Sequence, residues 1–183
     1  MRRWSRRRRR EVVRLAALLA LAAATAFFGR GHWPYGMRSG SSDPFPAEVS
    51  GWGRPIDGDS LWVGRNEVRL KGIDAPEGRQ TCQRNGAAWR CGDAARDALQ
   101  SMIGRDDVTC SVSERDKYGR LLAACRAGDR NLNAGMVAAG MAVAYGSYWR
   151  EEADAKASHR GIWKSEFQMP RQWREENSDA QPR

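Results

Sequence analysis

Histidine is almost absent from this chain, and cysteine is too sparse and too widely spaced to form the usual zinc motifs. His32 and His159 are the only histidines among 183 residues, so neither a multi-histidine metal site nor a serine–histidine–aspartate hydrolase is expected. None of the four cysteines belongs to a Cys-x-x-Cys pair, which argues against a structural zinc site.

A general excess of positive charge is also missing, although the net charge of +9 first suggests one. Residues 1–14 contain eight arginines and a single acid, Glu11, and so carry +7 of that charge. The rest of the chain has only +2. This excludes a domain that is basic over its whole surface, and any nucleic-acid site must therefore be a local patch.

An uncharged run, LAALLALAAATAFFG, follows the arginines over residues 15–29. A basic segment before a short apolar run is the pattern of an export signal, and residues 1–28 are predicted to be a signal or membrane anchor. Cleavage and retention both remain open. Either places the following domain outside the cytoplasm, in a periplasmic, extracellular or membrane-anchored protein. The alternative is a basic RNA-binding tail beside a buried helix.

The remaining chain divides by composition into three parts. Residues 29–47 are rich in Gly, Ser and Pro and are interpreted as a linker. Residues 48–173 are long enough to bury one core without a partner, so a monomeric domain is expected there. Residues 174–183 are interpreted as a disordered tail.

The cysteines are expected to form two disulfides. Cys110 and Cys125 lie at equal distances from the turn sequence Asp-Lys-Tyr-Gly at 116–119, and an antiparallel hairpin without a bulge would place them face to face. Cys82 and Cys91 would then close the loop between them. Four buried free thiols in a cytosolic protein are the alternative, but the export pattern favours disulfides.

The hydrophobic pattern predicts an α+β domain. Strands are expected over 48–56, 60–63, 67–73 and 141–145, a hairpin around residues 116–119, and helices over 91–103, 132–139 and 151–160. This strand set suits a five-stranded barrel of the OB type with helices packed around it.

Three short motifs place charge at turns. The first, Asp57-Gly-Asp59-Ser, aims two carboxylates toward one point, as a hard cation requires, although Asp-Gly is also an ordinary turn. The second runs from Arg69 to an acid-Ala-Pro-acid corner formed by Asp74 and Glu77. The third, at 116–120, ends in Arg120, and two guanidiniums could hold a phosphodiester by forked hydrogen bonds.

In this order, the motifs DGDS, RLKGIDAPE and DKYGR make residues 48–163 resemble the thermonuclease family of staphylococcal-nuclease-like domains. The resemblance implies a five-stranded OB barrel with three helices that cleaves DNA and RNA with Ca²⁺. It implies metal ligation by Asp59, Asp74 and the Ala75 carbonyl, and it implies that Asp57 orients metal-bound water. It further implies Glu77 as general base, Arg69 and Arg120 as phosphate clamp, and Lys117, Tyr118 and Tyr145 as nucleotide contacts.

Two hypotheses of different classes follow. The first is an exported, Ca²⁺-dependent phosphodiesterase that acts on DNA or RNA. The second is a non-catalytic OB module that binds single strands or a cell-envelope polymer, for which Trp52 and Trp62 are the candidate stacking residues. The presence of Arg69, Glu77 and Arg120 favours the enzyme.

Overall fold

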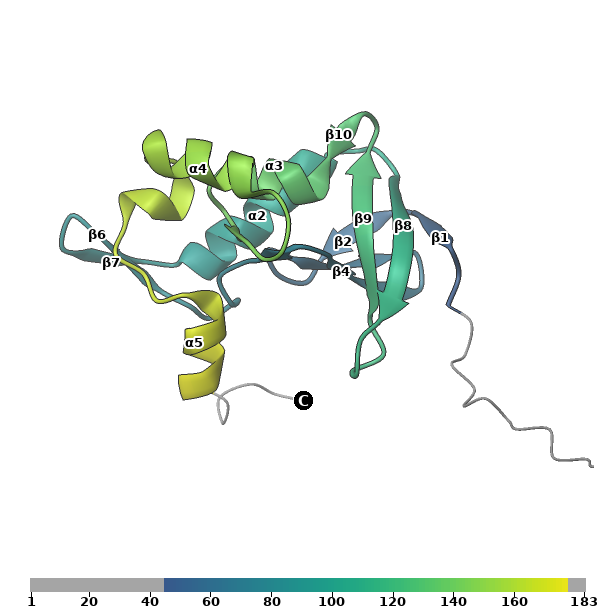
Figure 1. Cartoon of the computed structure of the whole chain (residues 1–183), viewed down its shortest axis with the longest axis horizontal. Helices are drawn as coiled ribbons and strands as arrows, with labels where there is room; N and C mark the ends of the chain where they lie inside the picture. The colour runs from purple at the N-terminus through teal and green to yellow at the C-terminus, as the bar shows by residue number, and fades with distance from the viewer. Residues whose placement is uncertain (1–44, 178–183) are drawn as a thin grey trace, which may run out of the picture. The chain divides into compact units, whose positions relative to one another are not determined.

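The computed structural model describes residues 45–177 (Figure 1). The expected signal or anchor, most of the linker and the end of the chain lie outside these residues. Within them, no helix is both long and apolar enough to cross a membrane.

Within residues 45–177 the main sheet has seven strands, and most of these pair with a strand that is close in the sequence. Six strands follow the spatial order β1-β8-β9-β4-β3-β2, and β10 pairs with β9 outside this path. The strands are β1 (Glu48–Gly51), β2 (Gly53–Pro55), β3 (Ser60–Val63), β4 (Asn66–Leu70), β8 (Val108–Arg115), β9 (Leu121–Ala127) and β10 (Arg130–Asn131). Pairing is antiparallel except between β4 and β9, where Val68 lies beside Leu121.

The α+β class is confirmed, and no closed barrel is found in residues 45–177, where a five-stranded barrel of the OB type was expected. The path of paired strands there ends at β1 on one side and at β2 on the other. The strand expected over 48–56 is divided between these two ends, and the strand expected over 67–73 is divided as well. In the second case Gly72 has φ +84°, which only glycine adopts without strain. Beyond it β5 (Ile73–Asp74) pairs with β11 (Val143–Ala144) in a separate ribbon.

The described part has four α-helices where three were expected. They are α2 (Cys91–Ile103), α3 (Leu132–Ala138), α4 (Trp149–Ala157) and α5 (Pro170–Glu176), with a 3₁₀ turn at Gly161–Lys164. Asn131 caps the start of α3, since its side chain accepts a hydrogen bond from the Ala134 amide at 3.0 Å. Helix α5 begins with Pro170 at its first turn and extends past Trp173, where the domain was expected to end.

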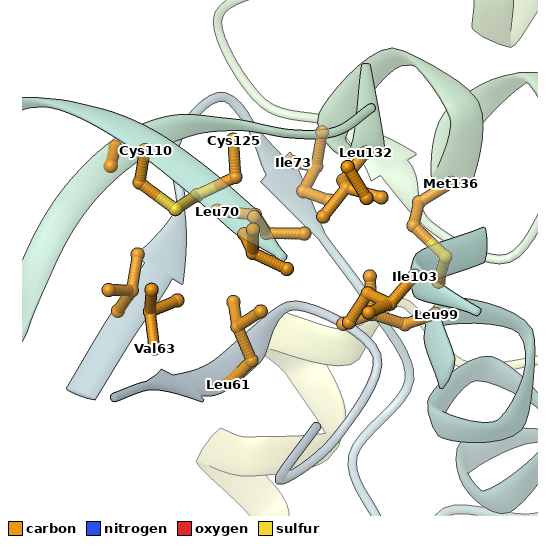
Figure 2. Close-up of a cluster of buried hydrophobic side chains, with 14 of the residues drawn as sticks. Leu61, Val63, Leu70, Ile73, Leu99, Ile103, Cys110, Cys125, Leu132 and Met136 are labelled. Atoms are coloured by element: carbon orange, nitrogen blue, oxygen red, sulfur yellow. A yellow bond between two sulfur atoms is a disulfide. The ribbon is translucent and has the colours of Figure 1, made fainter. Parts of the chain in front are cut away.

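The core lies between the sheet and helices α2 and α3 (Figure 2). Alternate residues of β9 are buried, as a strand with one covered face requires. The disulfide between Cys110 and Cys125 joins β8 to β9 within this core, and the two residues are paired in the sheet. A register shift between Val112 and Glu114 lies nearer the turn and does not disturb that pairing.

A second hairpin, β6 (Cys82–Arg84) and β7 (Ala87–Trp89), stands apart from the main sheet and was not expected. The Cys82–Cys91 disulfide closes its base. Its backbone pairs with Glu166 through Gln83, and its Trp89 indole donates to Ser165 Oγ at 3.0 Å. The hairpin therefore holds the chain that leads into α5.

Candidate active site

The turn between β2 and β3 is shaped by one carboxylate and contributes another. Asp57 Oδ1 accepts hydrogen bonds from the Asp59 and Ser60 amides at 2.9 and 2.7 Å. Gly58 fits because a Cβ there would lie 2.6 Å from the Cβ of Ala95 and 2.7 Å from that of Ala75. Burial raises the pKa of Asp57, while these amide bonds oppose the rise. Asp57 thus fixes the conformation that points Asp59 inward.

Asp59 is buried, with only 2% of its surface exposed, yet every oxygen of its carboxylate has a partner. Oδ1 accepts from Ser60 Oγ at 3.0 Å and from Arg69 Nη1 at 2.9 Å, and Oδ2 accepts from the Ala75 amide at 2.9 Å. Burial raises the pKa of Asp59 to about 7, although the charge of Arg69 acts in the opposite direction. This carboxylate needs positive charge beside it.

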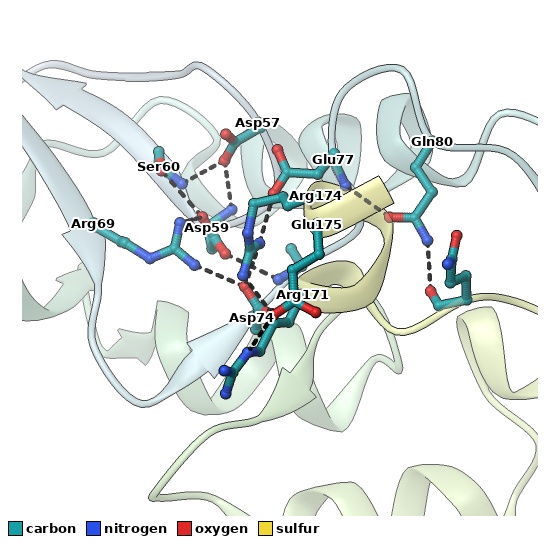
Figure 3. A network of polar contacts seen from close by, with 12 residues as sticks. Asp57, Asp59, Ser60, Arg69, Asp74, Glu77, Gln80, Arg171, Arg174 and Glu175 are labelled. Atoms are coloured by element: carbon teal, nitrogen blue, oxygen red, sulfur yellow. Dashed lines mark hydrogen bonds and ion pairs between the residues drawn. The ribbon is translucent and has the colours of Figure 1, made fainter. Parts of the chain in front are cut away.

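Arg69 joins the two acidic motifs. Ser60 and Arg69 are paired residues of β3 and β4, so the hairpin itself brings Arg69 beside Asp59. Its Nη2 also donates to Asp74 Oδ1 at 2.8 Å, while β5 holds Asp74 opposite Val143. Burial opposes the charge of the guanidinium, but Asp59 and Asp74 raise the pKa of Arg69 overall. The structure thus brings together Asp59, Arg69 and Asp74 (Figure 3). The Ala75 amide bonds to Asp59 as well.

A second arginine, which the sequence analysis missed, reaches this site from α5. Arg174 donates to both oxygens of Asp74, at 2.9 and 3.1 Å, and to Glu77 Oε1 at 2.6 Å (Figure 3). Arg174 lies outside all three motifs and about a hundred residues from its partners, so no local pattern could point to it. The signals available were Pro170 and the Arg171–Glu175 spacing, which are typical of a short helix.

Glu77 is held by the loop that leads to the β6–β7 hairpin. Its amide donates to Oε1 of the fully buried Gln80 at 3.1 Å, and the Gln80 amide returns a bond to the Glu77 carbonyl at 2.7 Å. Burial raises the pKa of Glu77, and the hydrogen bond and charge of Arg174 partly offset this rise. A carboxyl group with a raised pKa beside other acids is typical of a group that exchanges protons.

The third motif forms the turn of the β8–β9 hairpin and has its own ion pair. Arg120 Nε donates to Asp116 Oδ2 at 2.8 Å, and this guanidinium and the Lys117 ammonium lie 5.5 and 5.0 Å from the centre of the Tyr118 ring. Tyr118 and Tyr145 are both largely exposed. Arg120 therefore bonds within its own turn. The two guanidiniums that bond Asp74 belong to Arg69 and Arg174.

The arrangement offers oxygen ligands to a cation. Asp59 and Asp74 bond to one guanidinium and so lie close together, and the Ala75 backbone bonds to Asp59. In residues 45–177 no group of three or more His, Cys, Asp or Glu side chains is arranged to hold a metal ion. A cation here would depend on two carboxylates, a backbone carbonyl and water, a donor set that fits Ca²⁺ better than Zn²⁺.

Comparison with known proteins gives a consistent result. Residues 67–165 match the model of a family described as staphylococcal nuclease homologue. A micrococcal nuclease of Shigella flexneri is 33% identical over 91% of this chain and 97% of its own length. Protein ParB of Escherichia coli is 34% identical over 69% of this chain and 78% of its own. An uncharacterized endonuclease of Escherichia coli O157:H7 is 33% identical over 64% and 78%.

Proposed function

Since the chain belongs to the staphylococcal nuclease homologue family, we propose that it is an exported, Ca²⁺-dependent endonuclease that hydrolyses phosphodiester bonds in DNA or RNA. The observation that carries this proposal is the bridge of Arg69 between the buried Asp59 and Asp74. A buried pair of acids held by one arginine, with Glu77 nearby, combines cation ligands, a base and a phosphate-binding group.

The cation would be held by the carboxylates of Asp59 and Asp74 and by the carbonyl of Ala75. Bound there, Ca²⁺ would supply positive charge to a phosphate oxygen of the substrate. The high pKa of the buried Asp59 supports this assignment, because a nearby divalent charge would relieve the cost of its ionisation.

The remaining residues carry out the hydrolysis. Glu77 takes a proton from the attacking water, and its partly buried carboxylate with a raised pKa suits a general base. Arg69 stabilises the charge that develops on the phosphoryl oxygens. Arg120 leaves Asp116 to contact the phosphate from the β8–β9 turn, where Lys117 and the exposed Tyr118 contact the nucleotide, as does Tyr145. Asp57 keeps the Asp59 turn in place.

The two disulfides support export, because such bonds persist in oxidising compartments. The proposed location is the periplasm, the extracellular space or the outer side of a membrane to which residues 1–28 remain attached. Nucleic acid is the proposed substrate and the monomer the proposed state.

The test is digestion of plasmid DNA and of RNA by the full chain, with Ca²⁺ and with excess chelator. Glu77→Gln should lower kcat by about 10²–10⁴-fold with little change in the thermal unfolding midpoint. Glu175→Gln is the matched control, because that carboxylate is exposed and, in the described part of the chain, forms its ion pair within its own helix. Full activity in chelator would refute the cation requirement. Near-normal turnover by Glu77→Gln would refute its role as base, and binding without cleavage would indicate the non-catalytic OB module.

A further inference from the structure

Arg174 bonds two residues that have other roles in the proposed function. Its guanidinium bonds both oxygens of Asp74, a proposed cation ligand, and one oxygen of Glu77, the proposed base. Arg174 lies beyond residues 67–165, the part that matches the family. The inference below rests on the proposed function, which assigns those roles to Asp74 and Glu77.

Several specific bonds bring α5 to this position. The side chain of Gln80, which is fully buried, donates from Nε2 to the Gln168 carbonyl at 2.6 Å and accepts from the Glu77 amide through Oε1. One glutamine thus connects the base to the segment that precedes α5. The backbone pair of Gln83 with Glu166 and the buried Pro170 fix the approach of the helix. These contacts together place Arg174 beside Asp74 and Glu77.

Arg174 and a divalent cation compete for the same electron pairs and the same negative charge. Both Asp74 oxygens already accept from this guanidinium, and a cation beside it would meet like charge at short range. The Arg174 side chain is 31% exposed, against 7% for Asp74. The arginine is thus the partner that can leave toward solvent while the carboxylate stays.

We propose that Arg174 is a built-in competitor for the divalent cation: α5 covers Asp74 and Glu77 until the cation displaces the guanidinium. This contact holds the enzyme in a low-activity state when the cation is scarce. If the covered state makes up about nine-tenths of the molecules, the apparent affinity for the cation falls about tenfold, because only the uncovered fraction binds.

The experiment measures cation binding without nucleic acid, so that it does not depend on catalysis. Ca²⁺ is titrated into the full-length protein by calorimetry, for wild type, Arg174→Ala and Arg174→Gln. Arg171→Ala is the matched control, since that arginine lies on the same helix and its only ion pair within residues 45–177 is with Glu175. Both Arg174 variants should bind Ca²⁺ about tenfold more tightly than wild type, and the control should bind unchanged. Circular dichroism verifies the folding of each variant.

Equal affinity in wild type and both Arg174 variants would overturn the proposed competition while leaving the cation site intact. Weaker binding by the variants would overturn it as well, since Arg174 would then support the site. Absence of Ca²⁺ binding in every form would refute the cation site of the proposed function, and the inference with it.

A measurement on the unmodified protein keeps the proposal testable if the variants fail to fold. Saturating Ca²⁺ should increase amide hydrogen exchange in residues 170–177 by at least about threefold, because Arg174 loses its ion pairs with Asp74 and Glu77, while exchange in α2 stays constant. Exchange in residues 170–177 that is unchanged or slower with saturating Ca²⁺ would overturn the proposal.

Discussion

Replacement of Arg69 by methionine should destabilise the metal-free protein strongly, because it leaves the carboxylate of Asp59 without its counter-ion. That carboxylate is 2% exposed and would keep only the Ser60 hydroxyl and the Ala75 amide as partners. Removal of one member of a buried ion pair costs about 3–5 kcal/mol. Asp74 is protected from the same loss, since Arg174 bonds both of its oxygens.

The cost can be assigned to Asp59 by a double-mutant cycle. The free energy of unfolding is measured in urea, in chelator at pH 8, for wild type, Arg69→Met, Asp59→Asn and the double variant. Because the neutral amide needs no counter-ion, the two changes should couple by about 1–3 kcal/mol, and the double variant should be more stable than Arg69→Met. Arg171→Met, which breaks only an exposed ion pair, should change stability by less than about 1 kcal/mol. A loss below about 1 kcal/mol for Arg69→Met, or simple additivity in the cycle, would refute the reasoning.

Three further outcomes are expected. The pKa of Asp59 is raised by burial to about 7 from 3.8, so the folded state binds more protons than the unfolded state between these values. Stability in chelator should therefore fall as pH rises from 4 to 7 and level off above 7, and a similar slope in Asp59→Asn would contradict this origin. Replacement of Cys110 and Cys125 by serine should lower the free energy of unfolding by about 3 kcal/mol for a 15-residue separation. If the serine variant and the oxidised wild type unfold at the same urea concentration, the disulfide does not stabilise the fold. Asn133 is fully buried and bonds the backbone of Lys71, Ala123 and Cys125. Its change to leucine should cost about 2–4 kcal/mol by thermal unfolding, more than Asn131→Ala, which removes the α3 cap and a side-chain bond to Tyr148.

The features predicted well from the sequence are those fixed by nearby residues. Helix α2 begins at Cys91 and ends at Ile103, as its apolar spacing indicates. The cysteine pairing in the β8–β9 hairpin depends only on distance from the turn, and the register shift at Ser113 falls between that turn and the disulfide. Asp59 and Arg69 meet because β3 and β4 are joined by a tight turn.

The features missed depend on contacts between distant segments. The β6–β7 hairpin has strands of three residues each, too short to show alternation, and it is fixed by its disulfide and by Glu166. Helix α5 is a seven-residue charged segment whose place is decided by Gln80 and Asp74. Which strands lie at the ends of the sheet likewise follows from tertiary packing, so the order of strands could not be predicted from the strand set alone.

The strand order has a consequence for the synthesis of the chain. Strands β8 and β9 lie in the middle of the sheet, yet they come last among its long strands, and both β1 and β4 pair with them. A ribosome therefore releases β1 and β4 well before their partners exist, and the sheet cannot be completed until Asn131, the end of β10, has emerged. Long-range pairing of this kind is slow, because the intervening chain must first be ordered. The Cys110–Cys125 bond changes this sequence of events: once oxidised, the late hairpin is a ready template on which the two waiting strands assemble, one on each side.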